Sequence, residues 1–168
     1  MTENTWNLAS LIERGGIHYN ISGSNPKELL AGAMDILPPI LSLDSKELYR
    51  EILEREALMP TGVGRGIALP HPRNPLLGDG GEPLTSSLPL VALVFPAQPL
   101  DWNTQDGSKV HTVFLIVSSS AKQHLNTLSK INFLCQQEKF YSLIKARSSK
   151  EDIIAAIREA EAGWAGAL

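Results

Sequence analysis

The chain has 168 residues, of which 43% are hydrophobic and 20% are charged, as expected for a soluble globular protein with one domain. The net charge of −3 argues against a nucleic-acid-binding surface, and the single cysteine, Cys135, excludes an intrachain disulfide. No apolar run approaches the length of a membrane span, and no secretion signal opens the chain. These features predict a cytoplasmic protein without membrane insertion.

The first half of the chain alternates predicted strands and helices with a glycine-rich loop. Two helix starts are marked by a capping pattern, in which a polar side chain precedes a glutamate by three residues, at Asn25–Glu28 and Asp44–Glu47. Residues 1–16 show no clear pattern. The predicted elements are a strand over 17–21, a helix over 26–37, a helix from Asp44, a loop over 60–66 and a strand over 66–69.

The second half contains two runs that are apolar on both faces, as in the central strands of a sheet that is covered on both sides. The predicted elements are a surface loop over 74–89, buried strands over 90–95 and 110–117, a turn within 99–107, and helices from Ser120, over 138–146 and from Ser148. Because strands alternate with helices, the predicted fold class is α/β, a mixed β-sheet sandwiched between α-helices. We expect a single domain over residues 1–168.

Two of the four histidines lie where a strand meets a loop or a helix. His71 stands between two prolines at the end of an apolar run, and these prolines restrict its backbone. His124 falls in the first turn of a helix just beyond a buried strand. Ligands bind at strand ends in open α/β sheets, so both are candidate site residues. The other two, His18 and His111, lie in strands and are interpreted as structural.

The chain lacks the spacing of the common metal and nucleophile sites. No two histidines or cysteines stand in a zinc-binding spacing, so we expect no metal and no cofactor. No Gly-x-Ser-x-Gly motif is present, and Cys135 falls inside a helix, where a structural role is expected. The glycines after Thr61 lack the flanking elements of a dinucleotide site, although their backbone amides could cradle a phosphate.

A histidine that itself carries a phosphoryl group is a further possibility, because imidazole is a nucleophile. Such a site needs a fixed tautomer, cationic or N–H donors for the phosphoryl oxygens, and an open face for partner proteins. His71 could supply the imidazole, and Arg55, His124 and the loop over 61–66 could supply the donors. These residues by themselves do not show whether the site transfers phosphoryl groups or only binds a ligand.

Several motifs resemble those of a known family. Arg55-Glu56, followed by TGVGRGIALPH over 61–71, resembles the signature of the fructose/mannitol-type IIA domains of the bacterial phosphotransferase system. Downstream, the strand over 110–117 and the pair His124-Leu125 with Leu128 resemble the family's apolar strand and helix start. The likeness extends over nearly the whole chain, from about residue 8 to 160.

The resemblance implies both a fold and a set of roles. The fold would be a mixed sheet between helices. His71 would accept a phosphoryl group at Nε2 from an HPr-type phosphocarrier protein, Arg55 would bind the phosphoryl oxygens, and His124 would hydrogen-bond near them. The phosphate pocket would be shaped by Thr61, Gly62, Gly64 and Gly66.

The resemblance also implies a phosphotransferase component rather than a small-molecule enzyme. We favour the nitrogen-regulatory branch of the family, because the chain carries no membrane segment and no fused IIB or HPr-like domain. In that branch, phosphorylation would control the binding of regulated target proteins. The alternative is a sugar-specific fructose/mannitol IIA protein that passes its phosphoryl group to a IIB domain.

Two prolines depart from the family pattern. Pro72 follows His71 where the family usually has glycine or alanine, and it removes a backbone N–H that could serve the phosphoryl group. Pro60 occupies a position that is usually small and polar, and the segment over 76–87 is longer than usual. Pro72 favours a second hypothesis, a phosphate-independent interaction module. A hydrolase or ligand-binding domain is the third.

Overall fold

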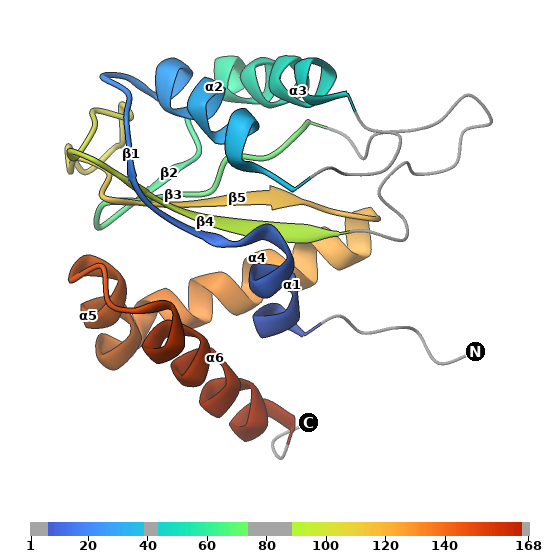
Figure 1. The fold of residues 1–168 in the computed structure, drawn as a ribbon, viewed down its shortest axis with the longest axis vertical. Helices are drawn as coiled ribbons and strands as arrows, with labels where there is room; N and C mark the ends of the chain where they lie inside the picture. The colour runs from blue at the N-terminus through green and yellow to red at the C-terminus, as the bar shows by residue number, and fades with distance from the viewer. Residues whose placement is uncertain (1–6, 39–43, 74–88, 166–168) are drawn as a thin grey trace.

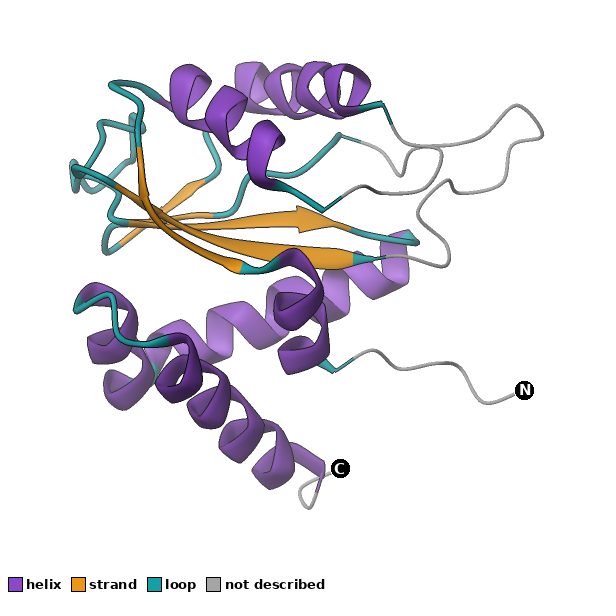
Figure 2. Ribbon diagram, viewed as in Figure 1, coloured by secondary structure: helices purple, strands orange, loops and turns teal. Residues whose placement is uncertain are grey.

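A five-stranded mixed β-sheet lies between two layers of helices (Figures 1 and 2). The computed structural model describes residues 7–38, 44–73 and 89–165. The helices α2 (Pro26–Ile36) and α3 (Ser45–Leu58) cover one face of the sheet. The other face is covered by α1 (Leu8–Gly15), α4 (Ala121–Gln136), α5 (Glu138–Lys145) and α6 (Lys150–Ala165). The α/β fold class predicted from the sequence is therefore confirmed.

The strands follow the order β1-β4-β5-β3-β2 across the sheet. Their bounds are β1 (Ile17–Ile21), β2 (Gly62–Gly64), β3 (Ile67–Ala68), β4 (Leu90–Pro96) and β5 (Thr112–Val117). The pairs β1–β4 and β3–β5 are parallel, whereas β4–β5 and β2–β3 are antiparallel. Every residue of β4 and β5 is buried, because helices cover both faces of these two strands.

The sheet separates two apolar cores. Side chains on alternate positions of β4, such as Leu93 and Phe95, pack with α1, α4, α5 and α6. The intervening positions, such as Ala92 and Val94, pack with α2 and α3. Both layers are therefore fixed to the same central strand.

Local side-chain caps start four helices, three at the positions that the sequence predicts and the fourth one residue later, at Ser149 rather than Ser148. The acceptor is Asn25 for the backbone N–H of Glu28, Asp44 for Lys46, Ser120 for Gln123 and Ser149 for Asp152, at 2.9 to 3.1 Å. A cap of this kind contributes about 1 kcal/mol to helix stability. These starts depend on neighbouring residues only, so they are visible in the sequence.

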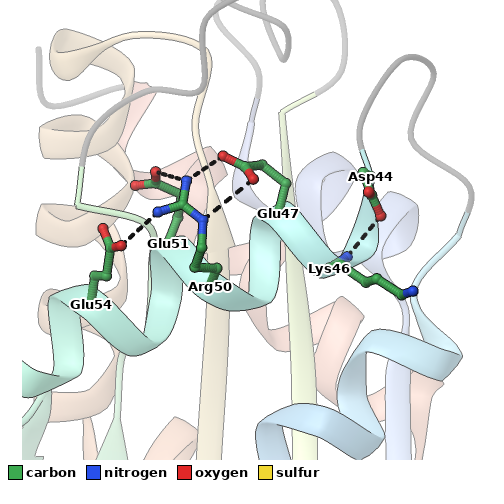
Figure 3. A network of polar contacts seen from close by, with 6 residues as sticks. All are labelled: Asp44, Lys46, Glu47, Arg50, Glu51 and Glu54. Carbon is green, nitrogen blue, oxygen red and sulfur yellow. Dashed lines mark hydrogen bonds and ion pairs between the residues drawn. The ribbon is translucent and has the colours of Figure 1, made fainter.

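The solvent face of α3 carries a network of charged side chains (Figure 3). The guanidinium group of Arg50 contacts Glu47, Glu51 and Glu54 at 2.5 to 3.1 Å. Exposed pairs of this kind stabilise a helix by only a few tenths of a kcal/mol each. Their main consequence is orientation, because the opposite face of α3 is left to bury Leu48 and Ile52 in the core.

The structure corrects three details of the sequence interpretation. Helix α1 forms in the segment where no element was predicted, and β2 lies within the predicted loop over 60–66. The strand predicted over 110–117 begins at Thr112, because Val110 instead forms an isolated bridge with Leu100. The predicted loop over 74–89 lies outside the described residues, apart from residue 89. None of the helices in the described ranges is long and apolar enough to cross a membrane.

Candidate functional site

Backbone hydrogen bonds hold the segment that carries His71. This segment follows β3, where the N–H of Leu69 donates to the carbonyl of Thr61 at 3.0 Å. The carbonyl of Pro70 accepts from the N–H of Ile116 in β5, also at 3.0 Å. The residues just before His71 are therefore fixed from both sides, in addition to the restriction that the two prolines impose.

The ring of His71 is held in one tautomer. Its Nδ1 lies 2.8 Å from the carbonyl oxygen of Leu69. Because a carbonyl oxygen only accepts, Nδ1 must carry the proton of the neutral ring, which leaves a lone pair on Nε2. Nε2 makes no hydrogen bond to any of the described residues, and the ring is half-buried. The arrangement presents Nε2 as the reactive nitrogen.

His124 stands beside His71. It occupies the first turn of α4, and the centroids of the two imidazole rings are 4.5 Å apart. Its Nδ1 lies 2.9 Å from the hydroxyl oxygen of Ser118, at the end of β5. The parallel pairing of β3 with β5 brings the two histidines to the same edge of the sheet.

Burial favours the neutral form of both rings. It lowers the pKa of His124 to about 4, with further lowering from His71, when that ring is charged, and from Arg55. Burial also lowers the pKa of His71, and the Arg55 charge adds to this, whereas the hydrogen bond to Leu69 raises it. A neutral imidazole at position 71 keeps the lone pair that nucleophilic attack requires.

Arg55 is placed by the last turn of α3. One of its guanidinium nitrogens donates to the carbonyl of Met59 at 2.7 Å, which satisfies a carbonyl group at the helix end. The charge is close enough to act on the pKa of both histidines. The structure thus brings His71, His124 and Arg55 together, as a phosphoryl site would require.

A cleft of about 700 Å³ opens beside Arg55 and His71, and His124 is not among the residues that line it. Its lining includes three of the predicted pocket residues, Thr61, Gly62 and Gly64, together with Arg55 and His71. Gly64 has a φ of +91°, and a side chain there would meet the carboxylate of Asp106 at 2.9 Å. The fourth predicted pocket residue, Gly66, is buried and is not among the residues that line the cleft, and a Cβ there would lie 2.3 Å from the ring of His111.

Two residues in or near the cleft, Glu56 and Arg65, lie within the quoted motif but are not singled out as site residues by the sequence. Glu56 binds Thr61 and Trp102, and its only sequence signal is its place after Arg55 in the motif. Arg65 lines the cleft, but its guanidinium lies 3.9 Å over the ring of Tyr141 and donates to Glu138 at 3.0 Å. Because α5 holds this side chain, Arg65 contributes mainly to the shape of the cleft wall.

The remaining histidines and the cysteine are bonded or buried within the fold. Nε2 of His18 contacts the carbonyl of Gly15 at 2.9 Å, and Nδ1 of His111 contacts the hydroxyl of Thr112 at 2.7 Å. Burial raises the pKa of the Cys135 thiol to about 12, which leaves it unreactive. In the part of the chain that the structure describes, no group of three or more histidine, cysteine or acidic side chains is placed to hold a metal ion.

The low pKa of His124 predicts a loss of stability in mild acid. In the unfolded chain this ring binds a proton near pH 6.5, whereas in the folded chain it does so only near pH 4. The unfolded state therefore holds more protons between these values, so the free energy of unfolding falls as the pH falls through this window. We expect the wild type to lose about 1–2 kcal/mol relative to His124→Gln between pH 7 and pH 5, after allowance for solvent screening. Urea unfolding at both pH values measures the difference, and equal losses in the two proteins would contradict it.

The chain matches known proteins over most of its length. The family model "Phosphoenolpyruvate-dependent sugar phosphotransferase system, EIIA 2" matches residues 10–160. The "Nitrogen regulatory protein" of Escherichia coli (strain K12) is 26% identical over 166 residues, which is 96% of each chain. The "PTS system fructose-specific EIIABC component" of Bacillus subtilis (strain 168) is also 26% identical, over 157 residues. That alignment covers 90% of this chain, which spans only 23% of that much longer relative.

Solved structures agree with the fold. The nitrogen regulatory protein IIA-Ntr from Neisseria meningitidis superposes with a TM-score of 0.73 at 22% identity, over 89% of this chain and 97% of that one. The mannitol enzyme IIA of Escherichia coli, solved in complex with phosphorylated enzyme IIB, gives a TM-score of 0.63 at 12% identity, over 85% and 94%. With the family model covering most of the chain, these likenesses lead to one conclusion. The chain belongs to the EIIA 2 family of the phosphoenolpyruvate-dependent sugar phosphotransferase system.

Proposed function

We propose that this protein is a phosphocarrier that accepts a phosphoryl group on Nε2 of His71 from an HPr-type carrier. It acts in the cytoplasm and belongs to the nitrogen-regulatory branch, in which the phosphorylated and unphosphorylated forms bind different target proteins. The observation that carries the proposal is the hydrogen bond from Nδ1 of His71 to the Leu69 carbonyl, which leaves the Nε2 lone pair available beside Arg55 and His124.

The transfer step needs no further reactant. The lone pair of Nε2 attacks the phosphorus of a phosphohistidine on the carrier, and the carrier's N–P bond breaks with its electron pair returning to that nitrogen. The group moves as PO₃⁻, so each imidazole keeps its own ring proton. The Arg55 guanidinium binds phosphoryl oxygens. A negative group placed beside His124 raises the pKa of that ring and so favours its protonated form, which donates charge-assisted hydrogen bonds.

The nitrogen-regulatory branch is supported by similarity to a nitrogen regulatory protein. The Escherichia coli nitrogen regulatory protein is 26% identical to this chain over 166 residues. A sugar-specific role, with transfer to a IIB domain, is the second candidate, and the mannitol IIA complex with phosphorylated IIB favours it. A phosphate-independent interaction module is the third, because Pro72 offers no backbone N–H beside His71.

Exposed aliphatic side chains around His71 suit a protein partner. Met59 and Val63 line the same cleft as His71, Leu58 precedes Met59, and Leu125 follows His124. All four side chains are more than half exposed. We call Leu58, Met59, Val63 and Leu125 the apolar collar. Exposed apolar groups gathered around a polar centre are typical of a protein-binding surface.

A charge in the apolar collar should block docking without harming the chemistry. We expect Leu125→Lys to slow phosphorylation by the HPr-type carrier by about tenfold or more, because the lysine must be desolvated on docking. Phosphorylation by phosphoramidate, a small donor that needs no docking, should be unchanged. Phe133→Lys is the matched control, because Phe133 is an exposed apolar residue of the same helix outside the collar. A slow reaction of Leu125→Lys with both donors would count against a docking role.

The proposed function is tested directly on the wild-type protein. Incubation with enzyme I, an HPr-type carrier and phosphoenolpyruvate should add about 80 Da, the mass of one phosphoryl group on a nucleophile. The ¹⁵N–³¹P coupling in a protein with labelled histidines should then locate the bond at Nε2 rather than Nδ1. No gain in mass with any carrier, or a bond at Nδ1, would overturn the proposal. The regulatory and sugar-specific branches are distinguished by the proteins that the phosphorylated and unphosphorylated forms capture. Capture of different target proteins by the two forms supports the regulatory branch, whereas transfer to a IIB domain supports the sugar-specific branch.

A further inference from the structure

Glu56 connects three segments that surround the cleft. It lies one residue after Arg55 in α3, and its carboxylate accepts from the backbone N–H of Thr61 and from the indole N–H of Trp102, both at 3.2 Å. It also accepts from the Thr61 hydroxyl. Thr61 is 6% exposed and Trp102 is 2% exposed, so water cannot readily replace the carboxylate as their acceptor.

The hydrogen bonds continue from Thr61 to the ring of His71. The Thr61 carbonyl accepts from the N–H of Leu69 at 3.0 Å, and the Leu69 carbonyl accepts from Nδ1 of His71 at 2.8 Å. Leu69 is itself buried. A continuous series of contacts therefore runs from the Glu56 carboxylate through the backbone of Thr61 and Leu69 to the imidazole.

We propose that Glu56 is a positioning residue for His71, which holds the Nδ1–H tautomer and ring orientation through Thr61 and Leu69. The inference rests on the proposed function, since it explains why Nε2 is the nitrogen presented to a phosphoryl donor. Without the carboxylate, Thr61 loses its anchor to α3, and the Leu69 carbonyl is no longer held against Nδ1. The ring then populates both tautomers and presents either nitrogen.

The charge of Glu56 has a separate effect. It raises the pKa of His71, in opposition to burial and to the charge of Arg55. Glu56→Gln separates the two effects, because the amide can still accept from Thr61 and Trp102 and can donate to the Thr61 hydroxyl, which is able to reverse its role. We expect this variant to keep the tautomer of His71 but to lower the pKa of the ring.

The decisive experiment measures the tautomer in the unphosphorylated protein. The ring ¹⁵N chemical shifts of His71 would be recorded at pH 7.5 for the wild type and for Glu56→Ala, Glu56→Asp and Glu56→Gln. Glu54→Gln is the matched control, because Glu54 lies on the same helix but contacts Arg50 on the solvent face. The rate of phosphorylation by phosphoramidate would be measured on the same samples.

We expect Glu56→Ala and Glu56→Asp to populate the second tautomer and to react at least about tenfold more slowly, because misplacement of a reacting group by about 1 Å can cost about a hundredfold in rate. Glu56→Gln and Glu54→Gln should keep the wild-type tautomer. If Glu56→Ala fails to fold, the tautomer of His71 in Glu56→Asp tests the proposal. The aspartate keeps the charge but is too short to reach both Thr61 and Trp102. An unchanged tautomer in every folded variant would overturn the proposal. The tautomer is measured in the unphosphorylated protein. Failure of this proposal can therefore be distinguished from failure of the proposed function, in which the wild type would accept no phosphoryl group.

Discussion

His71→Gln is expected to gain no phosphoryl group when it is incubated with enzyme I, an HPr-type carrier and phosphoenolpyruvate. Glutamine is similar in size and polarity to histidine, so the backbone bonds of Leu69 and Pro70 should persist, but its amide nitrogen is no nucleophile. Intact-mass spectrometry should show about 80 Da added to the wild type and none added to the variant. The expected effect is therefore complete loss of acceptance rather than a slower rate.

Two further histidine variants serve as controls for this result. His18→Gln and His111→Gln change rings that are bonded within the fold, and both should be phosphorylated to the wild-type extent. His124→Gln should still accept the group but more slowly, because one donor beside the phosphoryl oxygens is lost. Full phosphorylation of His71→Gln would show that another residue is the acceptor.

Gly15→Ala is expected to lower the free energy of unfolding by about 3 kcal/mol, which for a chain of this size lowers Tm by roughly 6–12 °C. Gly15 ends α1 where this helix touches the central strand β4. A Cβ there would lie 2.2 Å from the carbonyl oxygen of Val91 and 2.7 Å from the nitrogen of Ala92. Both are backbone atoms of a strand that is paired on both sides, so α1 must move away from the sheet. Thermal and urea unfolding measure the loss.

Gly32→Ala is the matched control for this prediction. Gly32 lies inside α2, and an added Cβ would make ordinary contacts at 3.7 Å with Ile21 and Ser22. This variant should be more stable than the wild type by about 0.5–1 kcal/mol, because alanine is the better helix former. If Gly15→Ala and Gly32→Ala had similar free energies of unfolding, helix propensity rather than the close approach of α1 to β4 would determine the effect of a substitution at Gly15.

Four of the helices that the sequence predicts have starts that depend on adjacent residues. Asn25 and Ser120 accept from N–H groups three residues later, and this spacing is readable in the chain. Helix α1 also has a local cap, since Asn7 accepts from the N–H of Ser10, but its first two N–H groups are bound by Glu161 from 153 and 152 positions away. The strand β2 cannot be predicted from the sequence. A three-residue strand with two glycines shows no alternation of apolar and polar residues, and β2 is defined by its pairing with β3.

The candidate site also combines local features, which the sequence shows, with distant contacts, which it does not show. The sequence places His71 and His124 near strand ends, but the contact between their rings depends on the parallel register of β3 with β5. That register joins Ile67 to Thr112, which are 45 positions apart, and no local pattern encodes it. The path from Glu56 to His71 runs through backbone carbonyls, and every residue type has a carbonyl. Its residues therefore stand out only when the chain is folded.

The bond between Glu161 and the start of α1 also bears on how the chain matures during synthesis. Helix α1 remains without its distant cap until residue 161 has been translated and has emerged from the ribosome. The neighbouring strand β1 likewise depends on β4, in which Leu93, the partner of Ile17, lies 76 positions later. Contacts of such long range fold slowly, since most of the chain must be ordered before they form. Nascent chains halted before α6 should therefore be cleaved readily by protease within α1, whereas released full-length chains should resist cleavage there.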